Sequence, residues 1–316
     1  MAIYPLFLAP MAELSHRALR ELIECFGGCD EYWTEMISAG ALTSGGQFEQ
    51  WYRDAGPRPE KTVFQLCGAK PEQLVKAAVL LNTLPCAGID INMGCCAPAI
   101  TRTGAGIQWM RDSERAAGLI AQVRAVVSCR LSVKIRLGFT EDFDCLLRFC
   151  KRLEAAGLDL ITLHPRTAQE KLKRRARWDY VYQLASCMQV PVVGNGDIAE
   201  PNDCMRREAE GRCYALMIGR GAVRKPWFFA QLKGTAPLSV DLEETALLFL
   251  AFLARYQPEP FHYSRACRFF TLFCDNLRWA HYLKQLLYKE RTLCGMEAVL
   301  RRYFYEHEEE KLWRLS

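Results

Sequence analysis

Residues 113–164 read SERAAGLIAQVRAVVSCRLSVKIRLGFTEDFDCLLRFCKRLEAAGLDLITLH. Two segments of this stretch, 113–127 and 143–157, repeat apolar residues at the spacing of a helix that is buried along one face. Each is followed within a few residues by a short run rich in leucine, valine and isoleucine, first at 131–137 and then at 158–164. Because helices that alternate with short apolar strands are typical of parallel βα units, this stretch predicts an α/β fold.

The same alternation extends along most of the chain and gives eight expected strands, with a further helical segment at 71–84 between the third and the fourth. Eight parallel βα units are the number that closes a (β/α)8 TIM barrel. A doubly wound open sheet is the alternative, but Ala9–Ala12, which follows the first strand, lacks the glycine-rich phosphate loop of that class. The pattern therefore favours the barrel. The expected strands are Tyr4–Leu8, Tyr32–Ile37, Thr62–Leu66, Gly88–Asn92, Leu131–Leu137, Leu158–His164, Val190–Gly194 and Tyr214–Gly219.

The pattern changes after residue 235, where turn-forming residues lead into a segment without strand signals. Helical periodicity dominates from there on, and Pro258 and Pro260 separate the first of these helices from the second. We therefore expect two domains, a TIM-barrel catalytic domain at 1–235 and a small all-helical C-terminal domain at 240–316. The expected helices of the second domain are 241–256, 261–283 and 284–306.

Composition limits the classes of protein to consider. The 316 residues are 50% hydrophobic, which suits a folded core, and the formal net charge of +5 alone neither requires nor excludes a nucleic-acid partner. Residues 1–12 lack the basic segment of a secretion signal, and no segment reaches the ~20 apolar residues of a membrane helix. Fifteen cysteines without Cys-x-x-Cys spacing indicate free thiols in a reducing cytoplasm and no metal site. We expect a cytoplasmic monomer that does not associate with membranes.

Polar residues gather where the expected strands end, which is the face that carries the chemistry in TIM barrels. Lys134 lies inside the fifth strand, and a lysine that faces the barrel interior needs an anionic partner. Glycine-containing turns follow the seventh strand at 195–197 and the eighth at 219–221, and such turns hold phosphate through backbone N–H groups. With Arg220 as a further donor, the set suits flavin mononucleotide (FMN), although other barrels bind sugar phosphates with similar clamps.

Ten short segments, in order and at a spacing that a barrel permits, resemble those of the tRNA-dihydrouridine synthases along nearly the whole chain. The resemblance implies an FMN-dependent barrel that reduces specific uridines in tRNA, together with a helical C-terminal domain that recognises tRNA. The segments are LAPMA (8–12), TEM (34–36), VFQLCG (63–68), GIDINMGC (88–95), TRTGAG (101–106), MRD (110–112), VKIRLG (133–138), LHPRT (163–167), VVGNGDI (192–198) and MIGRG (217–221).

The resemblance also implies roles for single residues. Cys95 matches the catalytic cysteine, and Asn92 and Arg166 match positions that surround the uracil and its ribose and phosphate. The positions that hold the flavin are matched by Pro10, Met11, Ala12, Gln65, Lys134, His164, Asn195, Gly196, Asp197, Gly219 and Arg220.

The implied reaction transfers hydride from the reduced flavin to C6 of uracil, while the thiol of Cys95 gives a proton to C5 from the opposite side. NADPH is the expected reductant, and because the chain has no dinucleotide-binding fingerprint it is expected to visit the flavin only transiently.

Three departures from the family pattern bear on this assignment. Cys96 and Ala99 stand where proline and lysine are usual, and Glu13 begins a run where a Gly-Val-Thr-Asp-like sequence is usual. Two adjacent thiols make the choice of Cys95 a matter of register, which the preceding Asn-x-Gly and the following Thr101-Arg102 favour. An altered choice of substrate and a lower activity are both compatible with these changes.

Two basic segments are candidates for binding tRNA. Residues 166–177 contain six Lys/Arg and one Glu and follow the sixth strand on the active-site face, whereas residues 255–302 mix cations with aromatic residues that mostly suit a helical core. The first segment is the preferred one. Two other functions stay open at this point. One is a small-molecule FMN oxidoreductase of the dihydroorotate dehydrogenase-like barrel type, which needs no basic helical tail, and the other is a tRNA-binding flavoprotein that has lost catalysis.

Overall fold

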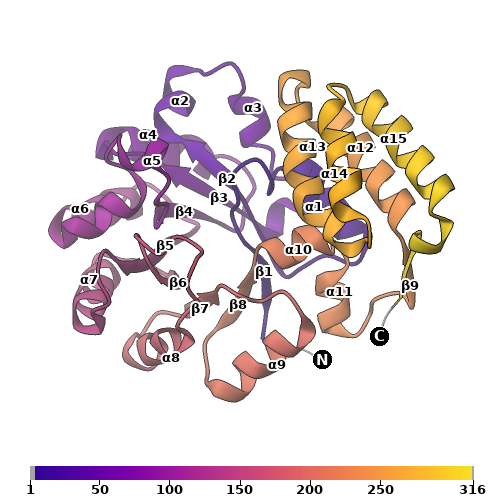
Figure 1. The fold of residues 1–316 in the computed structure, drawn as a ribbon. Coiled ribbons are helices and arrows are strands. Elements are labelled where there is room, and N and C mark those ends of the chain that lie inside the picture. The colour runs from indigo at the N-terminus through magenta and orange to yellow at the C-terminus, as the bar shows by residue number, and fades with distance from the viewer. Residues whose placement is uncertain (1–3, 315–316) are drawn as a thin grey trace.

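Eight parallel strands close into a barrel in the computed structural model, which describes residues 4–314, and a bundle of helices follows them (Figure 1). Strand β1 pairs with both β2 and β8, which completes the ring. Each expected strand overlaps an observed one, so the predicted TIM barrel is confirmed. The predicted domain limits at residues 1 and 316 lie outside the described residues. The strands are β1 (Leu6–Leu8), β2 (Glu31–Ser38), β3 (Thr62–Cys67), β4 (Gly88–Met93), β5 (Arg130–Gly138), β6 (Leu160–Thr167), β7 (Val192–Asn195) and β8 (Ala215–Ile218).

Helices surround the barrel, and those expected at 71–84, 113–127 and 143–157 are observed as α4, α6 and α7. Helices α6 and α7 each begin after an aspartate, Asp112 or Asp142, whose carboxylate accepts the N–H of the third residue on and so caps the helix. The helices of the barrel are α1 (Arg17–Cys25), α2 (Ala39–Ser44), α3 (Glu49–Tyr52), η1 (Pro59–Lys61), α4 (Pro71–Asn82), α5 (Pro98–Thr101), η2 (Gly106–Arg111), α6 (Ser113–Arg124), α7 (Phe143–Ala155), α8 (Trp178–Cys187), α9 (Pro201–Glu210), α10 (Arg220–Arg224) and α11 (Phe228–Lys233).

The inside of the barrel is divided between an apolar part and a polar part. Phe7, Trp33 and Met217 belong to a cluster of buried apolar side chains contributed mainly by the strands. Toward the carboxyl ends of the strands the register sets polar residues side by side, with Asn92 of β4 opposite Lys134 of β5. The parallel pairing therefore gathers polar groups from separate strands at one end of the barrel.

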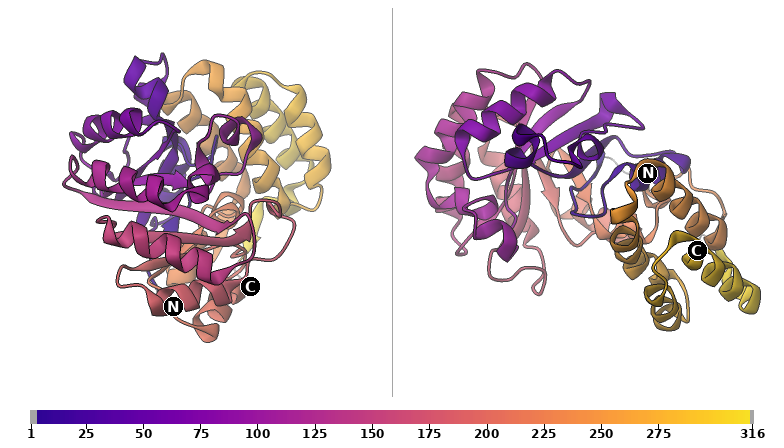
Figure 2. Two further views of the ribbon diagram at one scale, coloured as in Figure 1. Left: turned by 90° about the vertical axis from the view of Figure 1, so that its left-hand side faces the viewer. Right: turned by 90° about the horizontal axis from the view of Figure 1, so that it is seen from above.

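The helices after residue 235 form an extension at one side of the barrel (Figures 1 and 2). The first helix was predicted well, but the two segments expected at 261–283 and 284–306 are three helices. One break falls at Cys274–Trp279, and the other ends at Thr292, whose hydroxyl accepts the Gly295 N–H and starts the last helix. A two-stranded antiparallel ribbon, which no local pattern predicted, joins the two ends of the extension. Its elements are β9 (Ser239–Asp241), α12 (Leu242–Tyr256), α13 (Glu259–Phe273), η3 (Cys274–Asn276), α14 (Ala280–Lys289), α15 (Leu293–Glu306), η4 (Glu308–Glu310) and β10 (Leu312–Arg314).

No helix among residues 4–314 is both long enough and apolar enough to span a bilayer. The extension is instead held to the barrel by apolar packing and by one buried ion pair. Phe48 of the barrel and Phe261 of α13 pack with ring centroids 4.6 Å apart. Arg265 of α13 lies 3.0 Å from the carboxylate of Glu35 on β2, and both side chains are almost fully buried. Because each charge has been removed from water, each depends on the other.

We predict that Arg265→Ala lowers the free energy of unfolding by about 3–5 kcal/mol, because the substitution leaves the Glu35 carboxylate buried without its cation. Arg268→Ala is the matched control on the same helix. Arg268 also pairs with a carboxylate of the barrel, that of Glu13, but its side chain is 63% exposed, so a loss of at most about 1 kcal/mol is expected. Denaturant unfolding followed by circular dichroism measures both changes, and equal losses would contradict the importance of the buried pair.

Candidate active site

A cavity of about 560 Å³ opens at the carboxyl ends of the barrel strands. Its walls come mainly from the loops that follow the strands, and Leu272 and Asp275 of the extension complete them. Of the site residues predicted from the sequence, all but Gln65 line this cavity. They are Pro10, Met11, Ala12, Asn92, Cys95, Lys134, His164, Arg166, Asn195, Gly196, Asp197, Gly219 and Arg220.

Gln65 lies deeper in the barrel and has no exposed surface. Its side-chain amide donates to Asp90 at 2.7 Å and accepts from Asn92 at 2.9 Å. The side chain therefore underlies the cavity wall instead of forming part of it, and a direct contact with a flavin stays a prediction.

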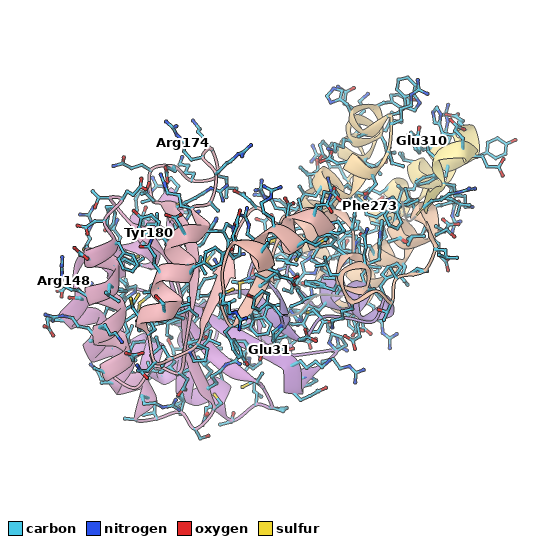
Figure 3. All side chains as sticks on the ribbon, turned by 90° about the horizontal axis from the view of Figure 1, so that it is seen from below. Glu31, Arg148, Arg174, Tyr180, Phe273 and Glu310 are labelled. Carbon is cyan, nitrogen blue, oxygen red and sulfur yellow. The ribbon has the colours of Figure 1, made fainter. Side chains whose placement is uncertain are left out.

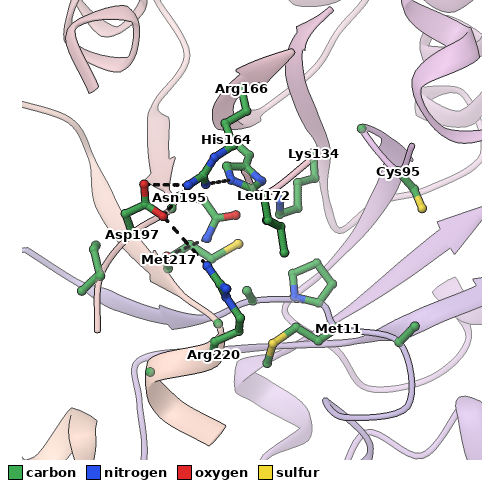
Figure 4. A pocket seen from close by; sticks show the side chains of 18 of the residues that line it. Met11, Cys95, Lys134, His164, Arg166, Leu172, Asn195, Asp197, Met217 and Arg220 are labelled. Atoms are coloured by element: carbon green, nitrogen blue, oxygen red, sulfur yellow. Dashed lines mark hydrogen bonds and ion pairs between the residues drawn. The ribbon is translucent and has the colours of Figure 1, made fainter. Parts of the chain in front are cut away.

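An ion pair between the buried Arg166 and the half-buried Asp197 forms one wall of the cavity (Figure 4). Nη2 of Arg166 donates to both carboxylate oxygens of Asp197, at 2.6 and 2.7 Å, and Arg220 lies 4.0 Å from the same carboxylate. Asp197 also accepts the Ala176 N–H at 2.7 Å. Although burial alone would raise the pKa of Asp197, the hydrogen bonds from Arg166 and Ala176 outweigh it and lower the pKa. The turn after β7 is thus fixed by a charged hydrogen-bond network.

The glycine of this turn is required by geometry. Gly196 has a φ of +128°, and a Cβ atom on it would lie 3.0 Å from both the Ala176 Cβ and the His164 ring. A side chain would therefore strain the backbone and press on the cavity wall.

His164 is a neutral acceptor in this wall. Nη1 of Arg166 lies 2.8 Å from Nε2 of His164, and since a guanidinium can only donate, Nε2 accepts and the proton resides on Nδ1. Burial and the surrounding cations, with Lys134 first among them, hold the pKa of His164 well below its ordinary value.

Lys134 faces the cavity from β5 without a paired anion. Among residues 4–314, no carboxylate lies within ion-pair distance of its ammonium group. Burial and the neighbouring Arg136 guanidinium lower the pKa of Lys134 to about 8, although Asp90 opposes the shift. With Arg136 and Arg224 also in the walls, the cavity has more cations than carboxylates. Such a cavity favours an anionic ligand.

Cys95 is on the side of the cavity away from the Arg166–Asp197 pair (Figure 4). Its backbone is held by two contacts, since its N–H donates to Asn92 Oδ1 at 2.9 Å and its carbonyl accepts the Ile107 N–H at 3.0 Å. Burial raises the pKa of the thiol, so the group is protonated at neutral pH. Cys96 does not line the cavity, so of these two neighbouring thiols it is Cys95 that faces it.

The loop between β6 and α8, residues 168–177, is held against the barrel by two arginines of the barrel strands. Arg136 donates to the Lys171 carbonyl at 2.9 Å, and Nε of Arg166 donates to the Arg174 carbonyl at 2.6 Å. Leu172 of this loop lines the cavity, and Figure 3 shows the side chain of Arg174 pointing outward from it. The cavity mouth therefore lies between a basic loop and the helical extension.

Several cavity residues were not predicted. Arg136 was recognisable, because it is a second cation on the same strand as Lys134 and two residues farther along. Leu172, Leu272 and Asp275 had no such signal, because a loop conformation and the docking of the extension bring them to the cavity.

The chain is similar to known proteins in sequence and in fold. Residues 7–255 match the model of a protein family described as dihydrouridine synthase (Dus). A probable tRNA-dihydrouridine synthase of Aquifex aeolicus is 32% identical over 242 residues, which cover 75% of this chain and 75% of the relative. A tRNA-dihydrouridine(16) synthase of Cupriavidus necator is 32% identical over 255 residues, which cover 77% and 78%.

Among solved structures, histamine dehydrogenase from Rhizobium sp. 4-9 is similar in fold, with a TM-score of 0.53 and 12% identity. The match covers 79% of this chain and 49% of that one. At this level of identity the likeness supports the barrel architecture and nothing finer.

We predict that Asp197→Asn lowers the free energy of unfolding by about 3 kcal/mol at pH 7, because Arg166 stays buried and loses its carboxylate partner. The pKa of Asp197 is lowered in the folded state, so its contribution is present above the unfolded pKa and is lost as the pH falls through the lower folded pKa. The difference between the two proteins should therefore stay constant from pH 8 to pH 5 and shrink only below about pH 4.

Thermal or denaturant unfolding across this pH range measures the difference. Asp144→Asn, at an exposed position on α7, is the control and should change stability by no more than about 0.5 kcal/mol. A difference that grows as the pH falls would contradict the sign of the shift.

Proposed function

Because this chain belongs to the dihydrouridine synthase family, oxidoreductases that act on uridine in tRNA, we propose that it reduces the C5–C6 double bond of tRNA uridine with bound FMN. The observation that carries the proposal is a cavity that combines unpaired positive charge with a protonated thiol, both at positions that match the family motifs. The family match disfavours a dihydroorotate dehydrogenase-like activity.

The cavity residues suit a flavin in charge and in shape. Lys134 has no ion-pair partner among residues 4–314, although the charge of Asp90 favours its ammonium form. It would stand near the electron-rich edge of the isoalloxazine, where a cation stabilises the reduced form. The turns at 195–197 and 219–221, with Arg220, would hold the phosphate, and Pro10, Met11 and Ala12 would support the ring. Bound FMN supplies hydride chemistry, and NADPH is the proposed source of its electrons.

The protein residues would orient the uracil and complete the reaction with a proton. Asn92 and Arg166 line the same cavity and are proposed to contact the base and its ribose and phosphate. Cys95 is proposed to act as general acid toward C5, which requires a protonated thiol, and the raised pKa of Cys95 supplies one.

Transfer RNA would be held on both sides of the cavity mouth. The loop 168–177 presents exposed cations, and the extension at 240–316 is proposed as a tRNA-recognition domain because two of its residues complete the cavity wall. A uridine reaches such a cavity only when it is extruded from the folded RNA, so contacts to the flanking backbone are needed. We further propose that the protein works as a monomer in the cytoplasm.

Deletion of the gene, followed by mapping of dihydrouridine in bulk tRNA, tests the activity, and at least one modified position should be lost. We predict that Cys95→Ala fails to restore it, with the rate on tRNA reduced by about 10²–10⁴, the usual contribution of a positioned acid. Cys96→Ala, which does not alter the cavity wall, should restore it.

Both purified variants should keep their flavin and its reduction by NADPH, because neither substitution removes a proposed flavin contact. Activity that survives Cys95→Ala but not Cys96→Ala would reverse the assignment of the acid. Full activity of both variants would refute a thiol acid.

We predict that Lys173→Gln/Arg174→Gln/Arg175→Gln weakens tRNA binding and lowers the slope of log K against log salt by about 2, because released counterions set that slope. The control pair Lys76→Gln/Arg148→Gln changes exposed cations on the outer helices α4 and α7 and should leave the slope unchanged. Fluorescence anisotropy with labelled tRNA at several salt concentrations measures both. Equal effects of the two sets would contradict a role for the loop.

A further inference from the structure

A buried carboxylate in the barrel lies at the start of a chain of hydrogen bonds that ends at Cys95. Asp90 of β4 has no exposed surface, does not line the cavity, and accepts from the Ser132 hydroxyl at 2.7 Å. Its second oxygen accepts from Gln65 Nε2 at 2.7 Å, and Gln65 Oε1 accepts from Asn92 Nδ2 at 2.9 Å. Asn92 Oδ1 then accepts the Cys95 N–H at 2.9 Å and the Gly94 N–H at 3.2 Å.

The direction of this chain is fixed at both ends. An ionised carboxylate can only accept, so Gln65 must turn its NH₂ group toward Asp90 and its oxygen toward Asn92. Asn92 must then donate to Gln65, which leaves its oxygen for the backbone N–H of Cys95. Reversing either amide would place two oxygens, or two NH₂ groups, against each other in a buried site.

The carboxylate is ionised at neutral pH. Burial raises the pKa of Asp90 to about 6, because desolvation outweighs the hydrogen bonds from Ser132 and Gln65 and the opposing charge of Lys134. At neutral pH Asp90 can therefore only accept hydrogen bonds, and the hydrogen bonds from Gln65 to Cys95 can run in one direction only.

We propose that Asp90 is a positioning residue for the reaction: through Gln65 and Asn92 it fixes the backbone of Cys95, and with it the thiol, at the cavity wall. The inference rests on the proposed role of Cys95 as the acid, but the hydrogen-bond chain itself can be tested without any activity. It assigns a function to a carboxylate that cannot touch flavin or substrate, because the cavity does not reach it.

The first test swaps the carboxylate and the amide. Asn92→Asp places a second acceptor-only group in the chain, so the Gln65 oxygen must face one of two carboxylates. Backbone amides at residues 94–97, followed by hydrogen exchange and mass spectrometry at pH 7.5, should then exchange about tenfold faster. In Asp90→Asn/Asn92→Asp the direction reverses with every bond kept and the formal charge of the wild type restored, so exchange should return to within about twofold of wild type.

Ser132→Ala is the matched control. It removes the other hydrogen bond to Asp90 and leaves the chain to Cys95 intact, so exchange at 94–97 should match that of the wild type. A double variant no better than Asn92→Asp, or an equal acceleration in Ser132→Ala, would overturn the proposal.

The second test separates the two halves of the catalytic cycle in Asp90→Asn, which keeps the shape but no longer enforces the direction. Reoxidation of the reduced flavin by tRNA, which needs the acid, should slow by about tenfold, whereas reduction by NADPH should stay within about twofold. A parallel fall in both steps would indicate a purely structural role or an effect through Lys134, and would overturn the proposal. A wild type that does not act on tRNA would refute the proposed function. The hydrogen-exchange pattern would still show whether the hydrogen-bond chain from Asp90 holds the backbone of Cys95.

Discussion

The parallel register of β4, β5 and β6 is the constraint on which the site depends. Pairing places Asn92 beside Lys134, and two residues farther along it places Arg136 beside His164. All four side chains then line one cavity, because parallel strands end at the same face of the barrel. Side chains alternate between the two faces of a strand, so a shift of one residue would exchange inward and outward positions and dismantle the set.

The register also concentrates positive charge where water is scarce. Burying these cations costs free energy, and Arg166 and Lys134 differ in how their charge is balanced. Arg166 is neutralised within the wall by Asp197, which fixes the turn after β7. Lys134 has no ion-pair partner within residues 4–314, and burial together with Arg136 lowers its pKa, so a nearby anionic ligand would favour its charged form. A cavity of this charge favours a ligand that brings negative charge to the lysine, as a reduced flavin would.

Local patterns were sufficient to predict the barrel and the glycine-containing turns at 195–197 and 219–221. Other cavity residues, such as Cys95 and Arg166, came from the family resemblance. Strands such as 131–137 are short apolar runs between amphipathic helices, and in this fold the residues at their ends must converge. The position of Gln65 was harder to predict, because its depth along the strand decides whether it meets a ligand or Asp90. The break before α14 and the pairing of β9 with β10 depend on contacts between distant segments, as does the approach of Leu272 to the cavity. The periodicity of a local segment does not predict its contacts with distant segments.

The extension and the cavity are coupled through the turn that follows β1. One oxygen of Glu35 accepts the Glu13 N–H at 2.7 Å, and the other meets Arg265 of α13. Glu13 adopts a φ of +62°, a conformation that costs a non-glycine residue on the order of 1 kcal/mol. Its own carboxylate pairs with Arg268, one turn along α13 from Arg265.

Because Ala12, the preceding residue, lines the cavity, the docking of α13 and the shape of the cavity are parts of one arrangement. A glycine in this turn would relieve the backbone but would remove the ion pair with Arg268. Glu13 thus keeps a strained backbone conformation and gains an ion pair with Arg268 of the extension. The extension is the part of the protein that is proposed to orient the RNA.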